Sequence, residues 1–188
     1  MRKIYFLALI LFAFNSYAQH QFNAELNLGY SFQEKTEINN QDTNSVDALG
    51  VRLGLNYQQV ILKQAYFEVG TFLKYNRSGN GIEGLDFTAD NLKFQVPLYF
   101  GYNINEKLKV SAGVGIENNK DFSDIDFKRK ENLRYDFLTK FVYDYGQKMK
   151  FSLYTHWSLS KTSDIYTISS PKNGIYLGVI YPLIKNKK

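Results

Sequence analysis

After residue 18, apolar and polar residues alternate along the chain in eight separate segments. In the first segment Phe22, Ala24 and Leu26 alternate with Asn23 and Glu25. A period of two is the pattern of a β-strand, because successive side chains of a strand point to opposite faces. The pattern predicts eight strands, over residues 22–32, 48–57, 65–75, 92–102, 108–117, 133–143, 149–159 and 175–183.

The connections between these segments alternate in length. Long connections are expected at 33–46, 77–90, 118–132 and 160–173, and short ones at 58–64, 104–107 and 145–148. If neighbouring strands are antiparallel, the long connections share one end of the sheet and the short turns share the other end with both termini. This layout predicts an all-β fold, an eight-stranded antiparallel up-and-down transmembrane barrel with four extracellular loops.

The apolar row is expected to face lipid rather than the interior. The chain has 15 Tyr and 15 Phe, and most of those after residue 18 lie on the apolar row. An eight-stranded barrel has an interior just wide enough for side chains to fill, so these rings would not fit inside. The opposite row is rich in glycine, which suits a narrow interior. A soluble, lipocalin-like ligand-binding barrel with its faces reversed is the alternative.

Aromatic residues gather toward both ends of the predicted strands, as in the interfacial girdles of membrane barrels. The short-turn girdle is predicted to contain Tyr57, Tyr102, Tyr143 and Tyr181, and the long-connection girdle Tyr30, Phe32, Tyr75, Tyr135 and Trp157.

Residues 1–18 have the form of a secretory signal peptide, with Arg2 and Lys3 before an apolar run and Ser16-Tyr17-Ala18 before the expected cleavage site. The barrel domain is then 19–188. Removal of the signal peptide lowers the formal net charge from +5 to +3, which is no footprint for nucleic acid. With no cysteine in the chain, disulfides, thiolate metal sites and Cys nucleophiles are excluded.

The predicted inward row carries charges of both signs, which is typical either of a selective pore or of a filled interior held by ion pairs. The second interpretation is favoured, because eight strands leave no room for a useful water column. No cofactor or metal site is expected. The predicted interior network contains Glu25, Arg52, Glu68, Lys74, Lys93, Lys109, Arg134, Asp136, Lys140 and His156, with Glu117, Asp144 and Lys150 on the same row.

Short motifs occur in order along the barrel: Val96-Pro97-Leu98, Gly113-Val114-Gly115 and the run from Leu177 to Tyr181. With these motifs the chain resembles the outer membrane protein beta-barrel domain family of Bacteroidota, the PorT-like group of small eight-stranded barrels. The resemblance implies an integral protein of the bacterial outer membrane. Because proline lacks a backbone donor, a bulge or bend is expected at Pro97.

His156 and Ser158 lie two residues apart on one strand and resemble the His-x-Ser pair of outer-membrane lipid A 3-O-deacylases. Leu159 stands where that family carries its oxyanion Asn, and no Glu follows Glu131. By parity both side chains should also point inward, away from lipid. Enzymatic hydrolysis is therefore an alternative, and a non-enzymatic protein is preferred.

The expected role is structural or interactive. The predicted partners are outer-membrane lipid, including lipopolysaccharide, and a protein that binds the extracellular loops. Apolar residues in three of those loops are candidates for docking such a protein: Ile82, Leu85, Phe87, Phe122, Ile125, Phe127, Ile165, Tyr166 and Ile168.

Overall fold

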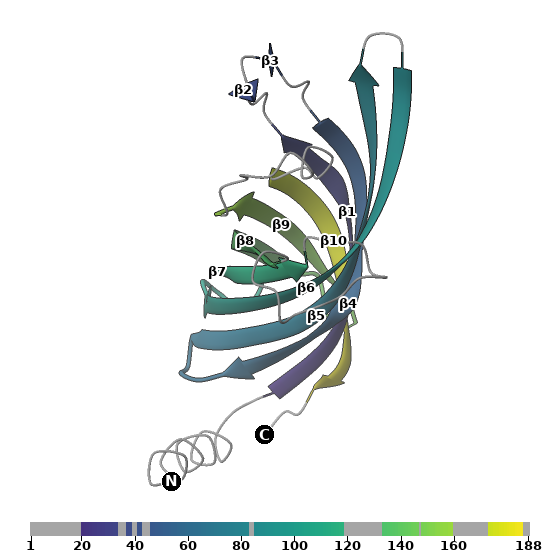
Figure 1. The fold of residues 1–188 in the computed structure, drawn as a ribbon. Coiled ribbons are helices and arrows are strands. Elements are labelled where there is room, and N and C mark those ends of the chain that lie inside the picture. The colour runs from purple at the N-terminus through teal and green to yellow at the C-terminus, as the bar shows by residue number, and fades with distance from the viewer. Residues whose placement is uncertain are drawn as a thin grey trace, which may run out of the picture.

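The computed structural model describes residues 20–33, 37–38, 41–42, 46–82, 85–118, 133–146, 148–159 and 173–185. Eight of its strands form one closed antiparallel barrel in the order β1-β10-β9-β8-β7-β6-β5-β4, which confirms the predicted fold class (Figure 1). No helix among the described residues is long and apolar enough to cross a membrane. The barrel strands are β1 (His20–Gln33), β4 (Val46–Val60), β5 (Ala65–Ile82), β6 (Leu85–Asn103), β7 (Leu108–Asn118), β8 (Leu133–Asp144), β9 (Lys150–Ser158) and β10 (Asn173–Lys185).

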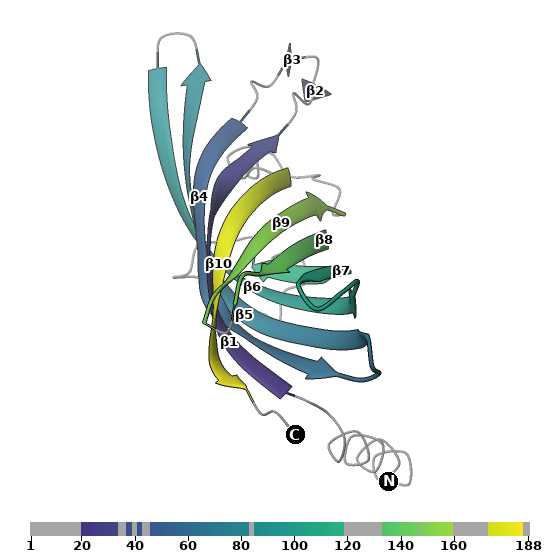
Figure 2. The same cartoon turned by 180° about the vertical axis from the view of Figure 1, so that it is seen from behind.

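The barrel closes where β1 pairs with both β10 and β4. Both described ends of the chain lie at the end that carries the short turns 61–64, 104–107 and 145–149 (Figure 2). This is called the short-turn end below. Two further strands, β2 (Glu37–Ile38) and β3 (Gln41–Asp42), pair only with each other, within the predicted connection 33–46.

The long connection predicted at 77–90 is wrong. Strands β5 and β6 continue through this stretch, and their ladder runs to the pair Ile82 and Leu85. The two strands project together beyond the rest of the barrel (Figure 1). The polar, glycine-rich composition predicted a loop, but backbone pairing does not require apolar side chains, and a two-residue connection suits a hairpin.

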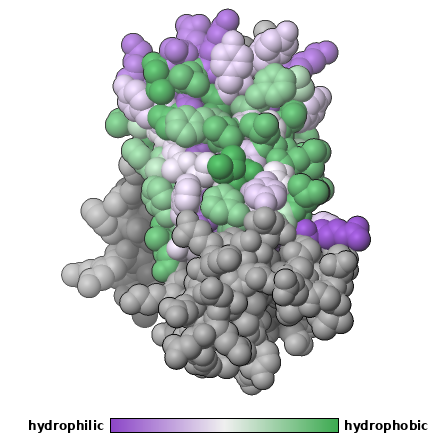
Figure 3. Space-filling view, turned by 90° about the horizontal axis from the view of Figure 1, so that it is seen from above, coloured by the Kyte–Doolittle hydropathy of each residue, from purple (hydrophilic) through white to green (hydrophobic). Residues whose placement is uncertain are grey.

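The outer wall of the barrel is apolar and its interior is polar. Leu26, Leu53 and Leu177 are exposed on the outside, whereas Glu25 and Arg52 are 1% and 0% exposed. Figure 3 shows apolar side chains across the wall and hydrophilic ones gathered along one edge. The lipocalin-like alternative required the apolar row inside, and the described interior does not have it.

Five large aromatic side chains point inward, although small residues were expected there: Tyr66, Phe72, Tyr99, Tyr154 and Tyr176. Four of them lie directly across the ladder from a glycine on the neighbouring strand. The pairs are Tyr66 with Gly101, Phe72 with Gly54, Tyr99 with Gly113 and Tyr176 with Gly29. A ring fits the narrow interior because the facing residue has no side chain.

The two prolines of the barrel wall affect the ladder differently. At Pro97 the pairing of β6 with β5 lapses between Val69–Leu98 and Phe72–Gln95, but the register is the same on both sides. The bulge predicted at Pro97 is therefore not found in this ladder. The register shift lies instead between Phe22 and Asn23 of β1, opposite Pro182, where β10 carries one extra residue.

Candidate functional site

The interior contains two ion clusters, and the first is centred on Lys140 of β8. The Lys140 ammonium donates to the carboxylates of Glu25 and Glu68, at 2.6 Å each. Glu25 also accepts from Asn56 at 2.8 Å and lies 3.5 Å from Nη1 of Arg52. These five residues, the Lys140 cluster, come from β1, β4, β5 and β8, so the cluster crosses the barrel from wall to wall.

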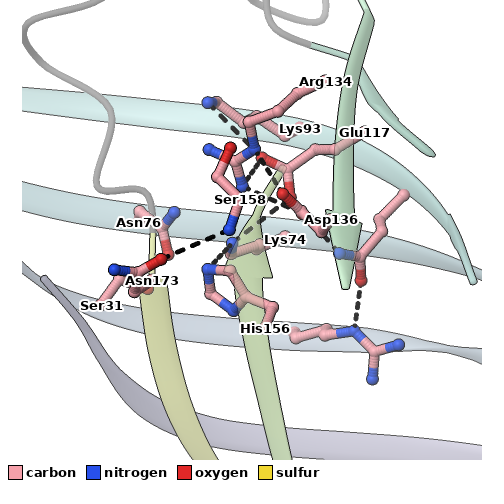
Figure 4. Close-up of polar contacts among 12 residues, drawn as sticks. Ser31, Lys74, Asn76, Lys93, Glu117, Arg134, Asp136, His156, Ser158 and Asn173 are labelled. Atoms are coloured by element: carbon pink, nitrogen blue, oxygen red, sulfur yellow. Dashed lines mark hydrogen bonds and ion pairs between the residues drawn. The ribbon is translucent and has the colours of Figure 1, made fainter. Parts of the chain in front are cut away.

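The second cluster surrounds Glu117 of β7 (Figure 4). Its carboxylate lies 2.8 Å from Nη2 of Arg134, 3.3 Å from Lys74 and 3.5 Å from Lys93. Arg134 is also 2.9 Å from Asp136, through its Nε atom. These five residues, the Glu117 cluster, are at most 5% exposed. Buried charges are costly unless they are paired, and each charge here has an opposite partner.

Arg52 and Gln95 join the two clusters. Nε of Arg52 donates to Oε1 of Gln95 at 2.9 Å, and Nε2 of Gln95 lies 3.5 Å from Glu117. The Arg52 guanidinium lies over two rings, 3.3 Å from the centroid of Phe72 and 4.3 Å from that of Tyr154. Side chains therefore contact one another continuously across the middle of the interior.

A hydroxyl network around Tyr176 lies beside the Glu117 cluster. The Tyr176 hydroxyl is 2.5 Å from that of Ser31 and 3.1 Å from Oδ1 of Asn76. The Tyr176 ring packs against His156 with 5.7 Å between centroids, and His156 stacks on Tyr154 at 5.9 Å. Nε2 of His156 lies 3.2 Å from Lys74, which links this network to the charges.

Nine of the ten residues predicted for the interior network are buried in these contacts, and Lys109 is not. Lys109 is half-buried at the short-turn mouth, where its ammonium lies 5.6 Å from the Tyr66 ring. It lines a cavity of about 420 Å³ at that mouth. The predicted network did not include six neutral residues that take part in these contacts, and their position on the inward row was the one available signal: Ser31, Asn56, Asn76, Gln95, Tyr154 and Tyr176.

His156 and Ser158 do not form a catalytic pair. The Ser158 hydroxyl and Nδ1 of His156 have no hydrogen-bond partner within the described part of the chain. Asp136 faces Ser158 across the ladder, but its carboxylate is bound to Arg134. His156 is also fully buried, with its other nitrogen toward Lys74. A serine hydrolase needs the base on the serine and an acid on the base.

The predicted girdle residues lie on the outer wall. Tyr57 is half-buried and stacks on His20, and the others of the four-residue short-turn set are exposed. In the other set, Phe32 packs edge-on against Trp157 at 6.3 Å. The exposed members are Tyr102, Tyr143 and Tyr181 in the short-turn girdle, and Tyr30, Tyr75, Tyr135 and Trp157 in the long-connection girdle.

The described residues offer no metal site, since no group of three His, Cys, Asp or Glu side chains comes together among them. A closed antiparallel barrel with an apolar wall and a polar interior is the architecture of an outer-membrane barrel. Residues 4–181 match the model of the family described as outer membrane protein beta-barrel domain. The chain belongs to this family and is a protein of the bacterial outer membrane.

Solved structures with a similar fold include a de novo designed transmembrane β-barrel, with 12% identity, TM-score 0.48, and coverage of 87% of this chain and 95% of the design. The outer membrane protein Ail of Yersinia pestis has 15% identity and TM-score 0.44, with coverage of 86% and 99%. OprG of Pseudomonas aeruginosa has 12% identity and TM-score 0.44, with coverage of 88% and 90%. No curated protein matches the chain significantly by sequence.

Proposed function

We propose that this protein is a closed, non-conducting barrel whose role is to present its long-connection end to a protein partner outside the cell. The observation that carries the proposal is the continuous contact of buried side chains from the Lys140 cluster through Arg52 and Gln95 to the Glu117 cluster. An interior held together in this way supports a rigid scaffold rather than a pore.

Burial of the charges is the argument against conduction. In an open channel, wall charges are exposed to water. Here the side chains of Glu25 and Arg52 are 0% exposed, and the contacts of Lys140 reach two other strands. Opening a water path would have to separate these ion pairs and the hydrogen bonds that join the two clusters.

The proposed placement has the termini and short turns in the periplasm and the long connections outside. The proposal includes export through a signal peptide at residues 1–18 and contact of the barrel wall with lipopolysaccharide. It also includes membership of the PorT-like group of Bacteroidota. The described residues do not include 1–18. They also leave out most of the connections at 118–132 and 160–173, with the candidate docking residues in those two connections. The pattern of long and short connections supports this placement.

Conductance in planar lipid bilayers tests the closed interior. We expect refolded 19–188 to give no channel steps. The double variant Arg52→Ala/Lys140→Ala, which removes the side chains that cross the interior, should give small ones. Lys109→Ala is the matched control, because Lys109 lies at the mouth outside both clusters. Steady conductance by the unaltered chain would overturn the proposal.

The placement can be tested in cells because the chain has no cysteine of its own. A membrane-impermeant maleimide should label Ser163→Cys in intact cells, and label Gly146→Cys only after lysis. Gly146 is suitable because a Cβ added there would meet nothing within 4 Å. The opposite labelling pattern would reverse the proposed orientation. A photoactivated crosslinker on Ser163→Cys should then capture the same protein from repeated preparations, and Gly146→Cys should not.

A further inference from the structure

Large apolar side chains are exposed on all three short turns. Leu62 is 68% exposed, Ile104 50% and Tyr145 73%. Leu62, Ile104 and Tyr145 follow the girdle tyrosines Tyr57, Tyr102 and Tyr143, and each lies beyond the end of its strand, on a turn. The Tyr145 ring packs edge-on against Phe151 of β9, with 6.0 Å between centroids, and still leaves most of its surface exposed. The three turn side chains fit a surface that lies in the boundary between headgroups and acyl chains, where such side chains are buried.

Each of the same turns also carries an exposed lysine: Lys63 beside Leu62, Lys107 three residues after Ile104, and Lys148 three residues after Tyr145. No hydrogen bond or ion pair is found for the ammonium groups of these lysines within the described residues. A lysine beside an apolar anchor can place its stem along the lipid and its ammonium at the phosphates.

The two ends of the barrel differ in charge. The three short turns contain three lysines, Lys63, Lys107 and Lys148, against the single carboxylate of Glu106. Connections 34–45, 83–84, 119–132 and 160–172 contain nine acidic and seven basic residues. Only the short-turn end therefore has the excess of positive charge that an anionic surface attracts.

We propose that the short-turn end binds the phosphate groups of anionic phospholipids. The binding surface, called the lysine rim, consists of Leu62 and Lys63, Ile104 and Lys107, and Tyr145 and Lys148. The apolar member of each pair enters the acyl boundary, and the ammonium donates to the lipid phosphate. The leaflet concerned is the inner one if the proposed periplasmic placement of these turns holds, but binding in defined vesicles does not depend on that placement.

The single tryptophan of the chain makes the test possible. Trp157 lies in the girdle at the other end of the barrel and reports on lipid there. The variant Tyr145→Trp/Trp157→Phe moves the reporter to the lysine rim. Both proteins, 19–188 in length, are refolded into phosphatidylcholine vesicles that contain increasing brominated phosphatidylglycerol or brominated phosphatidylcholine, and quenching of tryptophan fluorescence measures the relative binding of each lipid.

We expect the rim reporter to show binding of phosphatidylglycerol in excess over phosphatidylcholine, and Trp157 to show none. Substitution Lys63→Gln/Lys107→Gln/Lys148→Gln in the reporter background should reduce the preference, roughly fivefold for each lysine that contacts phosphate. The control Lys120→Gln/Lys128→Gln/Lys130→Gln removes the same charge from the other end and should leave it unchanged. Molar salt should weaken the preference by screening.

Equal quenching by the two lipids at the rim would overturn the proposal, as would the same preference at Trp157. If the lysine variant fails to fold, the comparison of Trp157 with the Tyr145→Trp/Trp157→Phe reporter still tests the proposal. Competition by lipid A but not by unbrominated phosphatidylglycerol would assign the rim to the other leaflet and contradict the lipid proposed here. The conductance and labelling experiments are independent of lipid charge, so failure of this proposal is distinguishable from failure of the proposed function.

Discussion

Lys140 is the residue whose loss should cost the interior most. It stands between two carboxylates, Glu25 and Glu68, and all three side chains are at most 4% exposed. Replacement Lys140→Met keeps the length of the side chain and leaves Glu68 without its ammonium partner. We expect destabilisation of about 3 to 5 kcal/mol, the range for removing one member of a buried ion pair. Urea unfolding in detergent micelles, followed by circular dichroism, measures it.

Two variants show whether this cost comes from the unpaired charge. Lys140→Met/Glu68→Gln removes one orphaned carboxylate and should recover part of the loss. Lys109→Met removes a half-buried lysine outside the clusters and should change the unfolding free energy by less than about 1 kcal/mol. Equal effects of Lys140→Met and Lys109→Met would show that the Lys140 cluster adds nothing to stability.

Gly29 shows what the inward rings require of the facing strand. A Cβ at this position would lie 2.3 Å from the backbone oxygen of Ile175 and 2.5 Å from Cγ of Tyr176. Gly29→Ala should therefore destabilise by about 1 to 3 kcal/mol, as overpacking does. Gly146→Ala is the matched control, because nothing lies within 4 Å of its Cβ. The two urea midpoints in micelles should separate, and coincident midpoints would mean that the ring of Tyr176 moves freely.

At the residue scale, alternation was enough to predict which side chains point inward. Glu25, Arg52 and Lys140 were assigned to the interior because they lie on the row opposite the large apolar residues, and they are buried. Their partners were not predictable. Lys140 meets Glu25 across 115 residues, and the distance depends on the stagger of strands around the whole barrel. The same is true of the glycine facing each ring, since a one-residue slip would place another residue there.

The tip of the β5–β6 hairpin is the segment whose removal should be tolerated. This tip, Asn80–Phe87, pairs only within the hairpin, whereas Gly79 still pairs with Asp47 of β4. Replacing residues 80–87 by Asn-Gly leaves every ladder of the closed barrel in place and offers a favoured hairpin turn. The shortened chain should refold in micelles with an unfolding midpoint close to that of the full chain.

The control for this shortening is the deletion of two adjacent residues from a strand within the closed barrel. Removal of Leu153 and Tyr154 from β9 shortens the element by two residues, keeps the parity, and takes away the Tyr154 ring that packs on Arg52. This variant should fail to give the compact, heat-sensitive gel band of a closed barrel. A similar failure of the hairpin variant would show that the projecting strands are needed for closure.

At the element scale, the eight strands could be predicted because each combines an apolar row with a polar row. The upper parts of β5 and β6 could not. Residues 77–90 include Arg77, Glu83, Asp86 and Asp90, so no apolar period marks them as strand. Where two paired strands extend beyond the lipid, backbone hydrogen bonds are enough to hold them together. Their side chains need not alternate between apolar and polar. The sequence signal therefore ends near the edge of the apolar wall while the strand continues.

At the scale of the whole molecule, the apolar wall leads to a prediction about charged substitutions. Their cost in folding free energy should depend on the depth of the residue in the membrane and not on the exposed fraction of its side chain. Leu177 and Leu62 are equally exposed, at 68%, but Leu177 lies in the middle of β10 and Leu62 on a short turn. In water both would tolerate lysine. In a membrane, Leu177→Lys places a charge near the bilayer midplane and should cost about 2 to 4 kcal/mol, whereas Leu62→Lys at the interface should cost about 0 to 1.

The measurement is urea unfolding of 19–188 refolded into phosphatidylcholine vesicles, with folding followed by gel mobility before and after boiling. Leu177→Lys should lower the midpoint and Leu62→Lys should leave it almost unchanged. Leu177→Ala separates the loss of side-chain volume from the charge and should fall between them. Equal midpoints for the two lysine variants would mean that both positions face water. Because the wall fixes the inside and outside of every strand at once, that outcome would require reversing the assignment of all eight.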